Sequence, residues 1–260
     1  MPHKFKRLCF ILIDMEDTFI YGMNPVLEAI RAGAALMVYI SGTRRQDVSL
    51  IEGLAAKSGV AVQRVGPSFF DAFPKGHQSV AAKVRKPALA GPEEMLDAAG
   101  RLGEPPLIVA LDGVEDPRNL GAIMRSALAL GSHGIIIPKR HGAGISPEAV
   151  KASAGAVWGL PVSVQPNIKY SLDELKEKGL LIVGAQVGGG VVPWQCDLGQ
   201  PLVLVLGGEQ AGLRRVVAQR CDYLLSVPMR AINSLNVSVS AGIFLYEIFR
   251  QRNSKKDRKT

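Results

Sequence analysis

The 260-residue sequence predicts an α/β protein in which a small N-terminal unit precedes a larger domain built on a parallel β-sheet. Short apolar runs alternate with amphipathic helical stretches along most of the chain, which is typical of the α/β class. The strands of the C-terminal half, such as LIVAL at 107–111, are apolar throughout, as in parallel strands covered on both faces. The segment GRLGEPP at 100–106 interrupts both patterns and predicts a boundary.

The first unit is expected to span 15–99. Its first helix is expected to have Asn24 as N-cap and Pro25 as its first residue. Periodicity predicts the other elements: strands at 35–40, 60–65 and 81–84, and helices at 47–59, 67–73 and 92–99. The apolar run Leu8–Ile13 is expected to be a buried strand, because acidic residues follow it where a signal peptide would be cleaved.

The second unit is expected to span 105–250. Its predicted strands cover 107–111, 134–138, 160–165, 180–187, 201–206 and 223–228, and its helices 119–130, 146–158, 171–178, 212–220 and 234 onward. Ser146 followed by Pro147 is a typical helix start, and Ser171 with Glu174 predicts a capping box.

Composition excludes several classes of protein. No apolar run approaches the roughly 18 residues of a membrane span, so no membrane partner is expected. The three cysteines, Cys9, Cys196 and Cys221, are scattered without CxxC spacing, which argues against a disulfide framework and a zinc site. We therefore expect no metal and a cytoplasmic location.

The charge is concentrated at one end of the chain. Residues 250–260 contain six Lys or Arg and one Asp, and so carry five of the formal net charge of +8. The basic tail at 251–260 would either add salt-sensitive affinity for a phosphate backbone or act only as a solubilising end.

Three segments place polar and glycine residues after predicted strands, where ligands bind in open α/β sheets. In the first, at 111–131, Asn119 and Arg125 are separated by nearly two helical turns, so both can approach one cleft. The structural alternative is an ordinary N-cap and a solvated arginine.

The second segment, VLVLGGEQAGLRR at 203–215, ends a buried strand in Gly207, Gly208 and Glu209. Adjacent glycines allow the backbone to approach a ligand, and Glu209 could accept hydrogen bonds from a nucleoside or orient Arg125. A tight turn with an exposed carboxylate would explain the same residues without a ligand. The pattern is not GxGxxG, which disfavours a dinucleotide site.

The third segment, at 227–247, has Ser234 and Asn236 at the start of an apolar helix, with Ser238 two residues later. Ser234 or Asn233 could be there as the N-cap of the helix. One cap does not require Ser234, Asn236 and Ser238 together, which favours a functional role for this cluster.

Together the three segments resemble the SpoU family of RNA ribose 2′-O-methyltransferases, in the SPOUT superfamily, over about 107–250. The first unit, with FIYGMNPVLEAI at 19–30 and HQSVAAKV at 77–84, resembles the substrate-binding domain of the branch that methylates a guanosine in 23S-type large-subunit ribosomal RNA. That domain is similar in fold to a ribosomal protein that binds RNA. The resemblance implies a deep trefoil knot in the C-terminal domain, a homodimer with its site at the subunit junction, and no DNA partner.

The resemblance also implies roles for individual residues. The catalytic and RNA-contacting positions of the family fall on Asn119, Arg125, Glu209, Ser234 and Asn236. The pocket for S-adenosylmethionine falls on Gly207, Val227, Met229 and Leu235.

A ribose hydroxyl is a poor nucleophile and must lose its proton as the methyl group transfers. The family's proposed proton acceptor corresponds to Arg125. Because a free arginine stays protonated, Arg125 could instead stabilise the developing alkoxide while a phosphate or Glu209 takes the proton. Ser234 and Asn236 would hold the cofactor carboxylate or the ribose in position.

The sequence departs from the family's pattern in two places. Ser79 stands where the family has the glycine of HQG, and the four residues between Met229 and Ser234 are one fewer than usual.

Three alternative functions stay open. The protein could catalyse the same reaction on transfer RNA, it could be a resistance-type methyltransferase acting on ribosomal RNA, or it could be a catalytically inactive RNA-binding protein.

Overall fold

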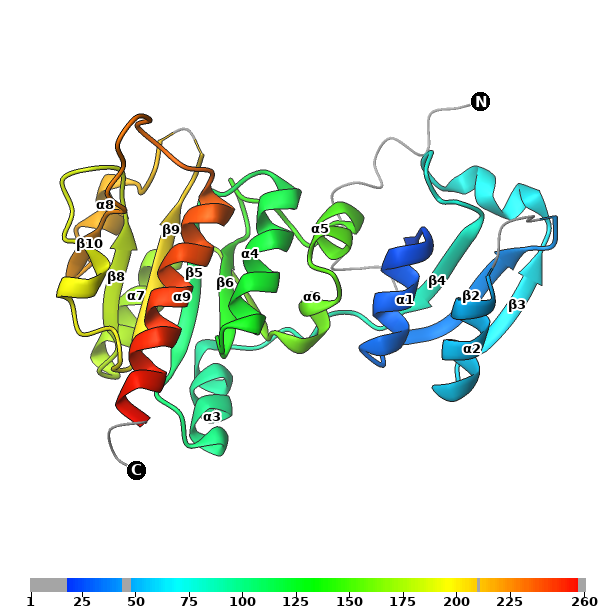
Figure 1. The fold of residues 1–260 in the computed structure, drawn as a ribbon, viewed down its shortest axis with the longest axis horizontal. Coiled ribbons are helices and arrows are strands. Elements are labelled where there is room, and N and C mark those ends of the chain that lie inside the picture. Colours follow the sequence, from blue (N-terminus) through cyan, green and yellow to red (C-terminus); the bar gives the residue numbers. More distant parts are fainter. Residues whose placement is uncertain (1–17, 44–47, 210, 257–260) are drawn as a thin grey trace.

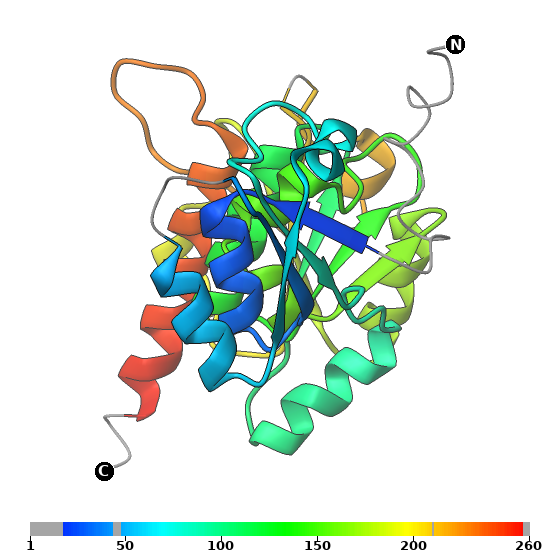
Figure 2. The same ribbon diagram turned by 90° about the vertical axis from the view of Figure 1, so that its right-hand side faces the viewer.

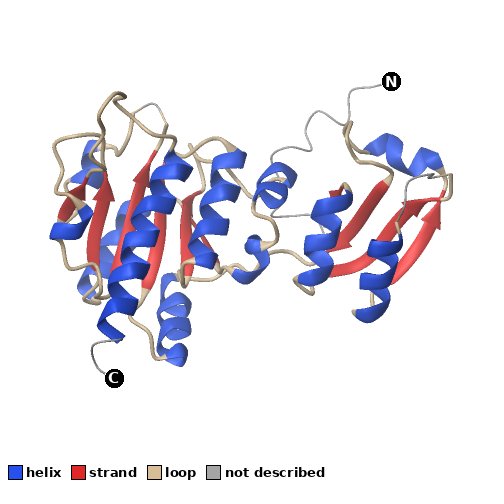
Figure 3. Ribbon diagram, in the orientation of Figure 1, coloured by secondary structure: helices blue, strands red, loops and turns tan. Residues whose placement is uncertain are grey.

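The computed structural model describes residues 18–43, 48–209 and 211–256, which form two units, each with its own sheet (Figures 1 and 3). The predicted strand at Leu8–Ile13 lies outside the described residues. Among those described, no helix is long and apolar enough to cross a membrane.

The first unit is a four-stranded sheet in the order β1-β4-β2-β3, in which only the β2–β3 pair is parallel. Its elements are β1 (Thr18–Tyr21), α1 (Met23–Arg31), β2 (Ala35–Ser41), α2 (Ser49–Lys57), β3 (Ala61–Val65), the 3₁₀ helix η1 (Pro67–Ala72) and β4 (Val80–Val84). Helices α1 and α2 lie side by side against the sheet (Figure 2).

The expected cap of α1 is wrong. The helix begins at Met23 with Gly22 as N-cap, and Asn24 lies inside the first turn. The backbone N–H of Met23 instead donates to Oε1 of Gln78 at 2.9 Å, so a residue distant in sequence satisfies a helix donor that capping would have satisfied locally.

Ser79, which replaces the family's glycine, has a φ of 54°, in the left-handed region that favours glycine. We expect Ser79→Gly to raise the free energy of unfolding by about 0.5–1 kcal/mol, because relief of the left-handed strain exceeds glycine's larger entropy loss. Urea unfolding of the two proteins measures the difference. A less stable glycine variant would show that the Ser79 side chain contributes more than its backbone costs.

The second unit is a six-stranded sheet in the order β10-β8-β9-β5-β6-β7, and every pair is parallel, as the apolar strands predict. Its strands are β5 (Leu107–Asp112), β6 (Gly134–Pro138), β7 (Val162–Gln165), β8 (Leu181–Ala185), β9 (Leu202–Gly207) and β10 (Tyr223–Leu225). Its helices are α3 (Pro92–Leu102), α4 (Pro117–Ala129), α5 (Pro147–Ala152), α6 (Ala156–Gly159), α7 (Ile168–Glu177), η2 (Pro193–Gln195), α8 (Arg215–Ala218) and α9 (Val237–Lys256).

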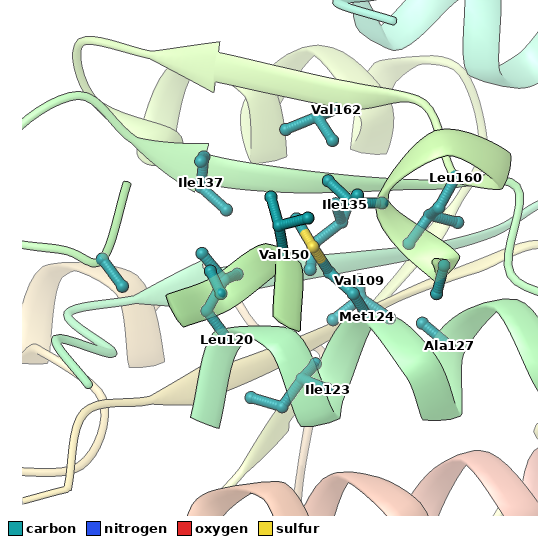
Figure 4. Close-up of a cluster of buried hydrophobic side chains, with 14 of the residues drawn as sticks. Val109, Leu120, Ile123, Met124, Ala127, Ile135, Ile137, Val150, Leu160 and Val162 are labelled. Carbon is teal, nitrogen blue, oxygen red and sulfur yellow. The ribbon is translucent and has the colours of Figure 1, made fainter. Parts of the chain in front are cut away.

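Helices cover both faces of this sheet. On one face, alternate residues of the central strands pack with α4 and α9, and Figure 4 shows part of this core around Val109, Ile135 and Met124. On the other face, Ile108, Ile136 and the remaining alternate residues pack with α3, α7 and α8. The strands are therefore buried on both sides, as their continuous apolar composition requires.

Helix α3 packs with a different unit from the one expected. Its sequence suggests a closing helix of the first unit, but Met95 is buried against the second sheet. A Cβ on Gly134 of β6 would lie 2.3 Å from the sulfur of Met95, so helix and strand are in direct contact. The segment before α3 runs along β7, where Ala90 N–H donates to Val162 O at 2.9 Å. The bounds 15–99 and 105–250 stay predictions, but the packing assigns 92–102 to the second sheet.

Two other helix starts also differ from expectation. Helix α7 begins at Ile168 with Asn167 as N-cap, so Ser171 is buried inside the helix and forms no capping box. Helix α9 begins at Val237 rather than at Ser234. The predicted cap at Ser146 is confirmed, since its side chain accepts from Ala149 N–H, but the helix there is divided into α5 and α6.

Candidate functional site

The candidate site lies where β5 and β9 end, at the carboxyl edge of the second sheet. The two strands are neighbours, with Asp112 opposite Gly207, so the loops after them lie side by side. The segment before α9 loops over this edge (orange in Figures 1 and 2). Three parts of the chain that are far apart in sequence thus meet at one place, as the strand-end rule predicts.

Asn119, Glu209 and Asn236 form one hydrogen-bonded network. Asn119 Nδ2 donates to Glu209 Oε1 at 2.8 Å, and Asn236 Nδ2 donates to Asn119 Oδ1 at 3.1 Å. Glu209 Oε2 also accepts from the backbone N–H of Glu115 at 3.4 Å. Each predicted segment therefore contributes one member, and the Asn119 amide is held at both ends.

Asn119 is free to join this network because it does not cap its helix. The N-cap of α4 is Asp116, whose side chain accepts from Arg118 N–H at 2.8 Å, so the capping alternative for Asn119 is wrong. Hydrogen bonds from the side chain and backbone of Arg118 lower the pKa of the Asp116 carboxyl. A charged carboxylate at this position suits a helix N-terminus.

Asn236 carries out the capping that the sequence suggested for Ser234 or Asn233. Its Oδ1 accepts from Ser238 N–H at 2.9 Å and from Ser238 Oγ at 2.6 Å, and its backbone carbonyl accepts from Ser240 N–H. One side chain thus fixes the start of α9 and joins the network, which explains why Asn236 and Ser238 stand together.

Arg125 and Ser234 are not part of this network. Both side chains are exposed, and neither forms a hydrogen bond or ion pair within the described part of the chain. Glu209 accepts from Glu115 and Asn119 rather than from Arg125 in the described chain, so its role in orienting Arg125 stays a prediction.

The glycines after β9 bring two loops into contact. A Cβ on Gly207 would lie 2.1 Å from the carbonyl carbon of Gly212, and one on Gly208 would lie 2.3 Å from Gly113 O. No side chain fits in either space. The backbone of this turn is therefore packed directly against the loop after β5.

A buried ion pair that the sequence did not reveal holds the same turn in place. Asp112 is fully buried at the end of β5, and its Oδ1 accepts from Arg214 Nε at 2.7 Å. Its Oδ2 accepts from the Arg214 backbone N–H at 2.8 Å. The aspartate in LDGVED and the arginine in GLRR were the only signals, and nothing in their spacing indicated a partner 102 residues away.

These loops enclose a cleft of about 560 Å³, large enough for a nucleotide. Its walls include Asn119, Glu209, Asp112 and Arg214. Arg140 and His141, from the loop after β6, complete its rim and were not singled out from the sequence.

The predicted cofactor residues come from two parts of the fold, since Val227, Met229 and Leu235 lie between β10 and α9 whereas Gly207 ends β9. Gly207, Val227, Met229 and Leu235 are all half-buried. Gly190 approaches the same segment so closely that a Cβ there would lie 2.6 Å from Leu224 O, and Ser226 Oγ donates to Gly190 O at 3.1 Å. Three close-packed loops with half-buried apolar side chains are compatible with the adenosine and thioether parts of S-adenosylmethionine.

The comparisons with known proteins match both units. The model of the SpoU rRNA methylase family matches residues 106–246, more than half of the chain. The chain belongs to the SpoU rRNA methylase family. A second model, for RNA 2′-O ribose methyltransferase substrate binding, matches residues 19–90 of this SpoU-family chain. The expectation of an S-adenosylmethionine-dependent RNA methyltransferase is thereby confirmed.

The relatives of this SpoU-family chain cover nearly its whole length. It is 41% identical to a tRNA/rRNA methyltransferase of Mycobacterium avium over 91% of this chain and 78% of that protein. It is 36% identical to a TrmH family tRNA/rRNA methyltransferase of Bacillus subtilis over 93% and 98% of the two chains. The SpoU methyltransferase AviRb of Streptomyces viridochromogenes, solved with its cofactor AdoMet, has a TM-score of 0.75 at 29% identity, over 92% and 91% of the chains.

The fold class predicted from the sequence is confirmed by these structures, and the trefoil knot stays a prediction.

Proposed function

We propose that this SpoU-family protein methylates a ribose 2′-hydroxyl of large-subunit ribosomal RNA, with guanosine as the target nucleoside. The proposal rests on the hydrogen-bonded network of Asn119, Glu209 and Asn236, of which Asn119 and Glu209 line a nucleotide-sized cleft. An amide held at both ends offers its remaining N–H and lone pair in fixed directions, which suits a ribose hydroxyl. The first unit, with its substrate-binding match, supports a large structured RNA.

The cofactor would be held by backbone rather than by charged side chains. Gly207 and Gly190 allow their loops to pack directly against neighbouring backbone, which would shape the pocket, and Val227, Met229 and Leu235 would offer the adenosine half-buried apolar surface. When bound, S-adenosylmethionine supplies a methyl group activated by a sulfonium.

Arg125 has the role of accepting the hydroxyl proton or of stabilising the negative oxygen as that proton leaves, and Ser234 positions the ribose or the cofactor carboxylate. Both side chains are exposed and uncommitted, so they are available to a substrate. Glu209 keeps Asn119 oriented. Asn236 connects this pair to the start of α9.

The protein acts in the cytoplasm as a homodimer whose site is completed at the subunit junction. Helix α9 exposes Val239, Ile243, Tyr246 and Phe249 at spacings of three and four residues, which place them on one face. Tyr246 is 60% exposed and Phe249 41%, a stripe of apolar side chains that water does not favour. We infer that a second copy of the chain covers this stripe. Helix α4 packs beside α9 and exposes Leu128 one turn after Arg125, so the apolar surface extends to a predicted catalytic residue. A second copy bound there would complete the site.

We expect Ile243→Glu to convert the dimer to monomers and to reduce methyl transfer at least tenfold, because a carboxylate would be buried without a partner. Analytical ultracentrifugation measures the first effect, and transfer of radiolabelled methyl the second. Leu50→Glu, which places the same charge at an exposed leucine of α2, serves as the control. A dimeric and fully active Ile243→Glu protein would contradict the proposed junction.

Competition between unmodified 23S-type ribosomal RNA and unmodified transfer RNA for one labelled cofactor tests the substrate. We expect label on the ribosomal RNA, at one guanosine. Label on transfer RNA instead would overturn the proposed substrate and retain the reaction. Cofactor binding without transfer to either RNA would contradict the proposed substrates and favour an RNA-binding protein without this activity.

A further inference from the structure

The loop after β6 places a cation at the rim of the cleft. Lys139 N–H donates to Gln165 O at 2.7 Å on one side, and Ala143 N–H donates to Val114 O at 2.7 Å on the other. Between these anchors the chain turns tightly, since a Cβ on Gly142 would lie 2.6 Å from the Pro138 ring. Arg140 and His141, both lining the cleft, are therefore carried by a loop that is fixed at both ends.

His141 gives this loop a second unusual feature. Its φ is 56°, in the left-handed region that non-glycine residues rarely adopt. Residues held in such conformations cluster at ligand sites, where surrounding structure offsets the strain. Here the strain accompanies a side chain at the cleft rim, next to Arg140.

Most other charged groups of the cleft wall already have partners in the described chain, with Glu115 as the exception. Arg214 donates to the buried Asp112, Glu209 accepts from Asn119, and Asp116 accepts from Arg118. Arg140 and His141 have no hydrogen bond or ion pair to any residue that the structure describes, and both are exposed. Among the described residues of the wall, Arg140 is thus the arginine whose guanidinium has no partner in the chain, whereas Arg214 is paired with Asp112.

We propose that Arg140, assisted by His141, forms a phosphate subsite that holds the backbone phosphate next to the acceptor ribose. This inference rests on the proposed function, because the anion is the RNA itself. A ribose held by Asn119 brings a phosphate on either side into the same cleft. A guanidinium binds phosphate oxygens with two parallel hydrogen bonds, and an imidazole N–H adds one more. Arg140 is a positioning residue for the substrate, and it takes no part in moving the proton.

The carboxylate of the cofactor is the other anion that enters this region, and one experiment separates the two. Full-length Arg140→Ala, Arg140→Lys and His141→Ala proteins are compared with the unsubstituted protein in methyl transfer to unmodified 23S-type ribosomal RNA. The KM for RNA is measured over a range of salt, and the Kd for S-adenosylmethionine by calorimetry. Arg101→Ala is the matched control, since Arg101 is an exposed arginine on α3 that does not line the cleft.

We expect Arg140→Ala to raise the KM for RNA about ten- to hundredfold, and to reduce the slope of log KM against log salt concentration by about 1. Arg140→Lys keeps the charge but loses the two-bond geometry, so it should restore the salt slope and only part of the KM. His141→Ala should show a smaller rise. The Kd for the cofactor should be unchanged throughout, as should thermal unfolding.

An Arg140→Ala protein with the KM and salt slope of Arg101→Ala would overturn the subsite and leave the proposed function intact. A weakened cofactor Kd with an unchanged salt slope would assign Arg140 to the cofactor carboxylate, and would also overturn it. Absence of methyl transfer by the unsubstituted protein would instead overturn the proposed function, and this subsite with it.

Discussion

Replacing Arg125 with alanine is expected to reduce methyl transfer about 10²- to 10⁴-fold while leaving affinity for S-adenosylmethionine within a few-fold. The side chain is exposed and makes no polar contact with the described residues, so its loss should not affect folding. Arg125 would act on the step in which the hydroxyl loses its proton, and not on binding. We therefore expect its loss to have the largest effect on the rate among the exposed residues of the chain. Single-turnover transfer of radiolabelled methyl measures the rate, and calorimetry the affinity.

The Arg101→Ala protein is again the matched control, because it loses the same charge from an exposed position on α3. It should retain full activity. Normal turnover in Arg125→Ala would remove this residue from the mechanism and leave the proton to Glu209 or to a phosphate. A variant that loses cofactor binding as well would show that Arg125 acts on the pocket rather than on the proton.

The second large effect is expected at Gly207. A Cβ there would lie 2.1 Å from the carbonyl carbon of Gly212 and 2.3 Å from the backbone nitrogen of Leu213, so neither neighbour can yield by rotating a side chain. Gly207→Ala must therefore open the turn after β9. We expect cofactor affinity to fall at least a hundredfold and the free energy of unfolding to fall by about 1–3 kcal/mol.

Gly100→Ala provides the comparison, since a Cβ at that position in α3 meets nothing within 4 Å. It should keep full cofactor affinity and gain up to about 1 kcal/mol of stability from the higher helix propensity of alanine. Calorimetry with S-adenosylmethionine and urea unfolding measure both quantities. If Gly207→Ala bound cofactor as well as Gly100→Ala does, the close-packed turn would not be part of the pocket.

The central strands of the second sheet were predictable from sequence because each is a short apolar run, and burial on both faces leaves few polar residues to obscure the pattern. Helix starts were less predictable because several residues can satisfy the same donors. Asn24 looks like a cap, yet Gln78 accepts from the first turn of α1. Ser171 has the right partner three residues later, yet Asn167 begins the helix earlier. In both cases a contact absent from the local sequence decides the start.

At the site, too, the location was predictable from the sequence and the side-chain contacts were not. The sequence located the three segments, because parallel strands bring their carboxyl ends to one edge. It did not predict which side chains join, since Asn119 bonds Glu209 rather than capping α4, and Asp112 binds Arg214 across 102 residues. Arg140 and His141 escaped notice because charged residues in a loop are ordinary, and only the structure shows that they line the cleft.

The central claim is that the methyl group goes to a ribose 2′-hydroxyl, and the most direct test is to locate the transferred label. Ribosomal RNA labelled by the protein with radioactive S-adenosylmethionine is hydrolysed in alkali, which cleaves every linkage except those next to a 2′-O-methylated ribose. We expect the label to be recovered in a single alkali-resistant dinucleotide whose 5′ residue is guanosine. Label recovered in mononucleotides would place the methyl group on a base and contradict the claim.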